Sequence, residues 1–163
     1  MILQQNVVLD ERTKQQHLKI RSVILGYNNN PTGASLTEKQ AIQLADFLDS
    51  MLQKYPEPGF SLILDEVYLG IFFSREYFSI FSVASERLLN STFLVLSASK
   101  GLGAMPGLRA GFCLCPNTSL IRLMVNIQMA CSGNCSILSQ IGLQASLSHL
   151  IEHPGFVLIF VQF

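Results

Sequence analysis

Four short, continuously apolar segments alternate with amphipathic ones along this chain of 163 residues, and this alternation constrains the fold more than any other feature. The apolar segments are rich in residues that favour strands, and they comprise residues 22–27, 60–64, 92–96 and 111–115. Strands without a polar face are typical of a sheet that is buried on both sides. The pattern therefore predicts an α/β fold in which helices cover both faces of a mostly parallel sheet.

The segments between and after these strands predict helices. Thr37 and Gln40 fit a capping box, and apolar residues then recur at helical spacing until the Pro56–Gly59 turn. Helices are also expected at residues 118–130 and 136–150, and a surface helix is expected at residues 8–20.

Composition excludes several classes of protein. The chain is 49% hydrophobic and 13% charged with a formal net charge of zero, so disorder and a basic nucleic-acid surface are both disfavoured. No apolar run reaches the roughly 18 residues of a membrane span, and the first residues lack the basic region of a signal peptide, so we expect a cytoplasmic protein. The four cysteines are expected to be reduced, buried thiols rather than metal ligands, and they are Cys113, Cys115, Cys131 and Cys135.

Polar residues follow the first three predicted strands directly. Asn30 follows the first strand, Asp65 the second and Lys100 the third. In open α/β sheets, ligands bind outside the carboxyl ends of the strands. We therefore expect these three residues to lie along one edge of the sheet.

Lys100 lies between small residues, and Arg109 follows nine positions later. A lysine in a partly dry pocket loses its proton readily and can form a Schiff base with an aldehyde, whereas a guanidinium group matches the geometry of a phosphate. An ordinary surface lysine remains the alternative for this residue. The Asp65 carboxylate suits pairing with a protonated ring nitrogen of a ligand, and the Tyr68 phenol could reach into the same space. For Asp65, a carboxylate that caps the following helix is an equal alternative.

A nucleotide-hydrolysing P-loop protein is the competing interpretation, because Asp65 and Glu66 follow an apolar strand. That class needs a G-x-x-x-x-G-K-[ST] loop earlier in the chain, and the sequence contains none. A dinucleotide fingerprint that starts at Gly101 fails because Pro106 occupies its third glycine position.

Three motifs together resemble the fold-type-I pyridoxal-phosphate enzymes, specifically the class I/II aminotransferases. They are N-N-P-T-G (29–33), D-E-V-Y (65–68) and S-A-S-K-G-L-G-A-M-P-G-L-R-A-G-F (97–112). The resemblance implies the incomplete three-layer large domain of these transferases and the cofactor pyridoxal 5′-phosphate (PLP).

The resemblance also implies a role for each matching residue. Lys100 would hold the cofactor covalently and move the substrate proton, and Asp65 would pair with the ring nitrogen. Asn30 and Tyr68 would bind the phenolate oxygen of the ring. The phosphate would be bound by Ser97, Ser99 and Arg109, although the Lys100–Arg109 spacing is one residue longer than the commonest family pattern.

Length is the main departure from the family, whose members are typically more than twice as long. We therefore expect residues 1–150 to be part of a large domain and residues 151–163 to be a divergent tail, with the small domain absent. The resemblance implies amino transfer between an amino acid and a 2-oxo acid, with a homodimer for the full-length parent. A C–S lyase or synthase of the same fold, or an inactive, aggregation-prone fragment, remains an alternative.

Overall fold

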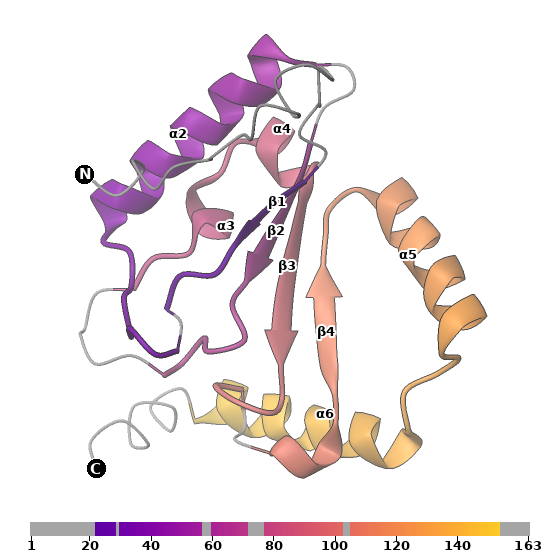
Figure 1. Ribbon diagram of the computed structural model, residues 1–163. Coiled ribbons are helices and arrows are strands. Elements are labelled where there is room, and N and C mark those ends of the chain that lie inside the picture. Colours follow the sequence, from indigo (N-terminus) through magenta and orange to yellow (C-terminus); the bar gives the residue numbers. More distant parts are fainter. Residues whose placement is uncertain (1–21, 29, 57–59, 72–76, 103–104, 154–163) are drawn as a thin grey trace.

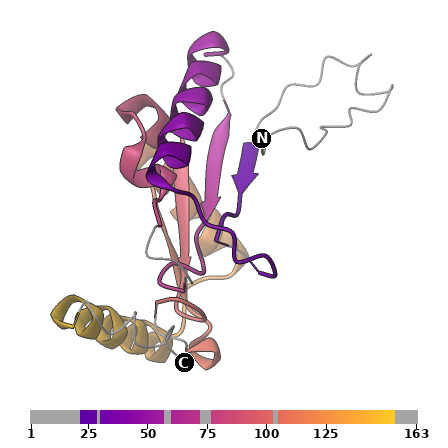
Figure 2. The same cartoon turned by 90° about the vertical axis from the view of Figure 1, so that its left-hand side faces the viewer.

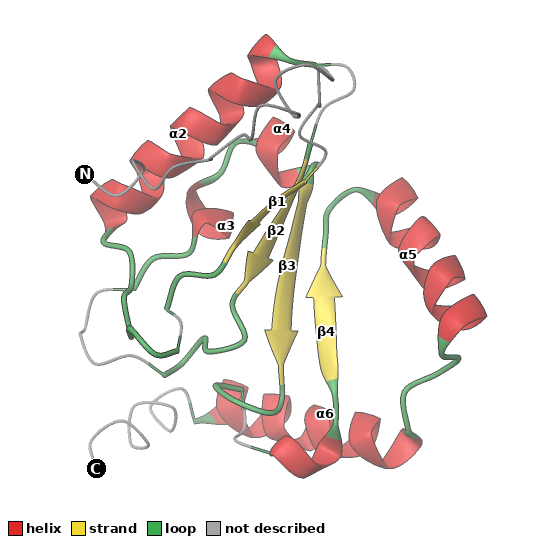
Figure 3. Cartoon of the chain, viewed as in Figure 1, coloured by secondary structure: helices red, strands yellow, loops and turns green. Residues whose placement is uncertain are grey.

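The computed structural model describes residues 22–28, 30–56, 60–71, 77–102 and 105–153 (Figure 1). The surface helix predicted at residues 8–20 and most of the predicted tail lie outside these ranges. Figure 3 shows the alternation of helices and strands that the apolar pattern predicts. No helix in the described ranges combines the length and the apolar character that crossing a bilayer requires.

Four strands form one sheet in the order β1-β2-β3-β4, with β1 at Ser22–Leu25, β2 at Ser61–Asp65, β3 at Thr92–Ser97 and β4 at Gly111–Leu114. β1, β2 and β3 are parallel, whereas β4 is antiparallel to β3. The carboxyl ends of the three parallel strands therefore meet at the lower edge of the sheet in Figure 1. The prediction of a mostly parallel sheet flanked by helices is confirmed.

The longest helix, α2 (Glu38–Lys54), begins at the predicted capping box. The Gln40 amide donates to the Thr37 hydroxyl at 3.4 Å, and the Thr37 amide donates to the Gln40 side-chain oxygen at 3.0 Å. These two bonds satisfy N–H groups that no helical carbonyl can reach. The helix buries one apolar stripe, which consists of Ala41, Ala45, Leu48 and Leu52.

The core lies on one face of the sheet. Figure 2 shows α2 and the short helices α3 (Ile80–Val83) and α4 (Glu86–Leu89) together on that side of the strands. Leu62 and Leu64 of β2 are fully buried there, as are Ile80 and Leu88 of the short helices. Alternate residues point to the opposite face, where Ile24 is 67% exposed. The expectation that helices cover both faces therefore holds for one face of the described chain.

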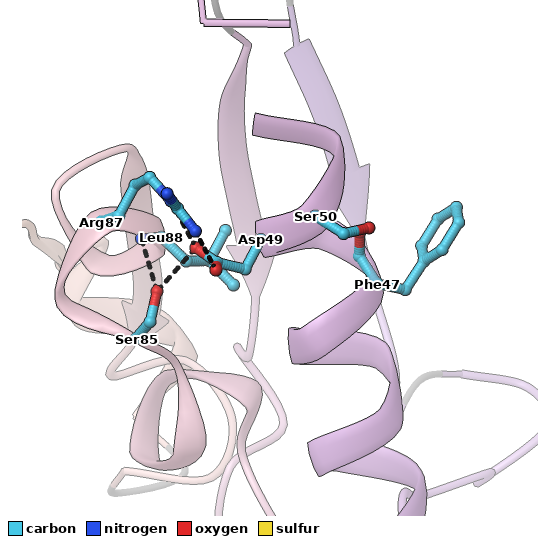
Figure 4. Close-up of polar contacts among 6 residues, drawn as sticks. All are labelled: Phe47, Asp49, Ser50, Ser85, Arg87 and Leu88. Carbon is cyan, nitrogen blue, oxygen red and sulfur yellow. Dashed lines mark hydrogen bonds and ion pairs between the residues drawn. The ribbon is translucent and has the colours of Figure 1, made fainter. Parts of the chain in front are cut away.

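Polar contacts fasten α4 to α2 at the surface (Figure 4). The Arg87 Nε donates to the Asp49 carboxylate at 2.9 Å, and the Ser85 hydroxyl donates to the same oxygen at 2.7 Å. The hydrogen bonds from Arg87 and then from Ser85 lower the pKa of Asp49 below its ordinary value. Ser85 also caps α4, because its side chain accepts a hydrogen bond from the Leu88 amide.

The C-terminal helices bury little of their surface. α5 (Thr118–Cys131) has no buried residue, and α6 (Ile137–Glu152) buries Ser139. The preceding one-turn helix η1 (Pro106–Leu108) contacts α6 near the lower edge of the sheet in Figure 1. The prediction of buried thiols is wrong, because Cys131 is exposed and the other three cysteines are half-buried. Cys131 ends the exposed helix α5, and Cys113 is paired in register with Val95 on the less covered face of the sheet.

Candidate functional site

The candidate site lies at the carboxyl edge of the parallel strands, where the turns after β1, β2 and β3 come together. The backbone N–H of Glu66 donates to the Val95 carbonyl at 3.0 Å and so extends the pairing of β2 with β3. The Asn28 side-chain Nδ2 donates to the Tyr68 carbonyl at 2.8 Å, which joins the first turn to the second. These bonds fix the first turn against the second and the second turn against β3.

Lys100 and Tyr68 lie side by side at this edge. The Lys100 Nζ atom is 5.8 Å from the centroid of the Tyr68 ring, within the range of a cation–π contact. The next residue explains the placement, because the Gly101 N–H donates to the Val67 carbonyl at 3.3 Å. A Cβ atom at position 101 would lie 1.5 Å from the Leu69 carbonyl oxygen. Only glycine therefore lets the backbone beside Lys100 pack against the turn that carries Tyr68.

Ser97, Ser99 and Arg109 form a second group at the end of β3. The Ser99 amide donates to the Ser97 hydroxyl at 3.1 Å, and Arg109 Nη1 lies 3.4 Å from the Ser99 hydroxyl. The Arg109 backbone adopts the left-handed conformation, with φ of 49°, which is uncommon for a residue with a side chain. Although Arg109 lies one residue farther from Lys100 than in the commonest family pattern, its guanidinium group still approaches Ser99.

Helix α6 supports the loop that carries Lys100 and Arg109. The Ser146 hydroxyl donates to the Leu102 carbonyl at 2.8 Å, and the Ser139 hydroxyl donates to the Leu108 carbonyl. A Cβ atom at Gly142 would lie 2.5 Å from a Leu108 methyl group, so the helix approaches the loop closely there. Helix α6 therefore contacts this loop at two places, Leu102 and Leu108.

Asp65 is the last residue of β2 and is exposed. It is paired in register with Val95, and Ser97 lies two residues beyond Val95, so Asp65 and Ser97 belong to the same face of the sheet. An Asp65 carboxylate oxygen accepts a hydrogen bond from the Val67 amide at 3.4 Å. A turn rather than a helix follows, so the alternative of a helix N-cap is wrong for this residue.

Asn30 lies in the turn after β1 and is exposed. Asn28, two residues before Asn30, is buried and has a positive φ of 58°. Asparagine tolerates this conformation better than most residues do. The Asn28 N–H donates to the Ala34 carbonyl and closes the turn. The geometry brings this turn to the carboxyl edge, while the role of the Asn30 side chain stays a prediction.

The chemistry of these residues fits PLP. Lys100 offers an amine to an aldehyde, Asp65 offers a carboxylate to a protonated ring nitrogen, and Arg109 with two hydroxyls offers cationic and neutral donors to a phosphate. Asn30, Asp65, Lys100 and Arg109 are all exposed. The described residues therefore form an open cradle rather than an enclosed pocket.

A buried cluster behind this cradle was not predicted from the sequence. Glu66 is 2% exposed and accepts hydrogen bonds from hydroxyl groups of Tyr27, Tyr77 and Ser79. The alternation along β2 contained the signal, because Leu62 and Leu64 are buried and Glu66 continues their period of two. Extending that pattern by one step would have placed the carboxylate on the buried face.

The chain belongs to the family described as aminotransferase class I and II, whose model matches residues 7–156. Members of this family are PLP-dependent enzymes, act on amino acids and keto acids, and are typically dimeric.

The chain is also similar in sequence to individual proteins. The chain is 34% identical to aromatic-amino-acid aminotransferase 2 of Thermococcus litoralis over 122 residues, which cover 74% of the chain and 28% of the relative. It is 32% identical to 1-aminocyclopropane-1-carboxylate synthase 5 of Arabidopsis thaliana over 108 residues, which cover 62% of the chain and 21% of that protein.

The solved structures show the same fold. A double mutant of Thermus thermophilus aspartate aminotransferase matches 94% of the chain with a TM-score of 0.70 and 22% identity. The match covers 37% of that aminotransferase chain. The chain thus spans between about a fifth and about two fifths of the length of these three proteins.

Proposed function

We propose that this chain carries the PLP-binding edge of an aminotransferase that exchanges an amino group between an amino acid and a 2-oxo acid. The observation that carries the proposal is the convergence of Lys100 and Tyr68 with Ser97, Ser99 and Arg109 on one edge of the sheet. Family membership and the similarity to an aromatic-amino-acid aminotransferase support it.

Family membership implies a task for each residue of the cradle. Arg109, Ser97 and Ser99 bind the phosphate, and Asp65 accepts a hydrogen bond from the protonated ring nitrogen. Asn30 and Tyr68 would bind the phenolate oxygen from the neighbouring turns after β1 and β2. Lys100 would hold the cofactor at its aldehyde group, and its amine would move the proton at the substrate Cα. When bound, PLP supplies the electron sink for this chemistry.

A synthase of the same fold is the second candidate. The similarity to 1-aminocyclopropane-1-carboxylate synthases of Arabidopsis thaliana and Solanum lycopersicum favours it. The cradle does not separate the two activities, because the same cofactor contacts serve both. An inactive fragment is the third candidate, and the exposure of the cradle residues supports it.

One labelling experiment separates these candidates. The chain is incubated with PLP, a ¹⁵N-labelled amino acid and a 2-oxo acid, and the products are identified by mass spectrometry. Transfer of ¹⁵N to the 2-oxo acid, lost in Lys100→Ala, supports the aminotransferase. A parallel incubation uses an amino acid that carries a leaving group on Cγ, because closing the cyclopropane ring must expel that group. Formation of 1-aminocyclopropane-1-carboxylate there supports the synthase instead, and no conversion of any amino acid supports the inactive fragment.

A homodimer is proposed as the assembly of the full-length parent. The exposed apolar residues of α5 support it, because large apolar faces mark sites of association. They include Leu123, Val125, Ile127 and Met129, each more than half exposed.

A further inference from the structure

The carboxylate of Glu66 is the most buried acidic group of the described residues, and the proposed chemistry gives it no task. The Ser79 hydroxyl donates to one of its oxygens at 2.5 Å, and Tyr27 donates to the same oxygen. The Tyr77 hydroxyl donates to the other oxygen at 2.5 Å. Both oxygens of a buried carboxylate are thus satisfied by hydroxyl groups.

Burial and the contact with Glu66 also act on the two tyrosine donors of the cluster. Burial first, and then the negative charge of Glu66, raise the pKa of Tyr27 well above its ordinary value. Burial and the hydrogen bond to Glu66 raise the pKa of Tyr77 in the same direction. Both phenols therefore stay protonated and remain donors.

The donors come from segments that are distant in the sequence. Tyr27 directly precedes the turn that carries Asn30, and its oxygen also accepts a hydrogen bond from the Ile80 amide at 2.9 Å. Ser79 is the N-cap of α3 and accepts from the Phe81 amide at 3.1 Å. Glu66 itself lies directly after Asp65. One carboxylate therefore joins the turn after β1, the turn after β2 and the start of α3.

We infer that Glu66 is a positioning residue that sets the distance between the two turns from which Asn30 and Tyr68 reach the cofactor. Its carboxylate holds Tyr27, and the next residue, Asn28, donates to the Tyr68 carbonyl at 2.8 Å. Loss of the carboxylate would loosen the first turn against the second, because the bond from Asn28 to Tyr68 would lose the support of Tyr27, while β3 and the Lys100 loop would stay in place. The cofactor-related part of this inference rests on the proposed function, whereas the anchoring of the turns does not.

The first test measures the anchoring without any cofactor. Amide hydrogen exchange is recorded for the wild type, Glu66→Gln, Tyr27→Phe and the control Glu86→Gln, which makes the same change at an exposed site. In Glu66→Gln, the Asn28 and Ile80 amides should exchange about tenfold faster, as the loss of one buried hydrogen bond predicts. The Ala98 amide, bonded to the Ala110 carbonyl at 3.1 Å, should not change.

The second test measures binding of PLP by fluorescence titration, followed by borohydride reduction and peptide mapping. Glu66→Gln should weaken binding about tenfold while saturating PLP still labels Lys100, and Tyr27→Phe should weaken it less. Glu86→Gln should bind as the wild type does. If Glu66→Gln fails to fold, Tyr27→Phe decides both tests through the Asn28 amide and PLP binding, with a smaller change expected in each. The Ile80 amide is left out for this variant, because Tyr27→Phe removes its hydrogen-bond acceptor directly.

The outcomes separate the inference from the proposed function. Unchanged exchange at Asn28 and Ile80, or an equal rise at Ala98, would overturn the inference. Faster local exchange with unchanged PLP binding would also overturn it, because the turns would then not set the site. If the wild type binds no PLP at all, the proposed function fails and the exchange rates alone decide the anchoring.

Discussion

The two halves of the molecule differ in how they use their apolar residues. In the first half, α2, α3 and α4 pack on one face of the parallel strands and bury Leu62, Leu64, Ile80 and Leu88 completely (Figure 2). In the second half, α5 buries no residue, and Leu138 and Ile151 of α6 are 73% and 80% exposed. The difference shows that the described chain has a core on one side and open apolar surface on the other. Its stability should therefore depend on the first half, and its tendency to associate on the second.

The largest effect should come from a cavity in the first half. Leu64→Ala removes a fully buried side chain and should lower the free energy of unfolding by about 2–5 kcal/mol. Leu123→Ala on α5, where the side chain is 55% exposed, should change it by less than about 0.5 kcal/mol. Urea unfolding followed by circular dichroism measures both. Equal losses would show that α5 belongs to the same core.

Substitutions at Gly101 and Gly107 test how closely the loop after β3 packs on the turn after β2. Gly101→Ala should cost about 1–3 kcal/mol of unfolding free energy, because the new methyl group overlaps the Leu69 carbonyl. It should also reduce labelling of Lys100 by PLP and borohydride. The matched variant Gly107→Ala meets no atom within 4 Å and should be neutral in both measurements. Full labelling in Gly101→Ala would contradict the packing of the Lys100 loop on the Tyr68 turn.

Replacing apolar residues of α5 should change association more than stability. The triple variant Leu123→Gln, Val125→Gln and Ile127→Gln should reduce self-association toward the 18.1 kDa monomer, because each residue is more than half exposed. Each site should contribute less than about 0.5 kcal/mol to the change in unfolding free energy. Sedimentation velocity gives the mass. Lys39→Gln with Asp46→Asn, on the polar face of α2, is the control and should associate as the wild type does.

The sequence predicted the elements that carry a strong local signal. β1, β2 and β3 begin or end within two residues of their predicted bounds, and the capping box at Thr37 is present. The helices α3, α4 and η1 were missed, because three or four residues are too few to show a helical period. The antiparallel direction of β4 was also missed, although no long helical crossover separates it from β3.

The candidate site was predictable to the extent that it follows strand ends. Lys100 and Tyr68 lie together, as do Ser99 and Arg109, but their roles toward PLP stay predictions. The cluster around Glu66 could not be assembled from the sequence, because Tyr27 and Ser79 meet it only through the tertiary fold. The exposure of the thiols could not be predicted either, because it depends on which face of the sheet and which face of α5 the other elements leave uncovered.

The smallest effect is expected at the surface pair between α2 and α4. Arg87→Gln removes the donor that holds the pKa of Asp49 below its ordinary value of 3.8. Because a depressed pKa stabilises the folded state only while the carboxylate is ionised, the contribution is present above that value and is lost as the pH falls through the lower folded pKa. The variant should therefore melt slightly below the wild type at about pH 7 and together with it at about pH 2. Thermal melts at both pH values measure the difference, and a larger gap at acid pH would contradict the assignment.

The most direct test of the central claim is the location of a PLP label. The chain is incubated with PLP, reduced with borohydride, digested and mapped by mass spectrometry, with Lys100→Arg as the matched control. The turns at the carboxyl edge predict a single adduct at Lys100, with Lys39 and Lys54 unlabelled and the adduct absent from the variant. An adduct spread over the lysines, or one centred on Lys39 or Lys54, would contradict a cofactor site at this edge of the sheet.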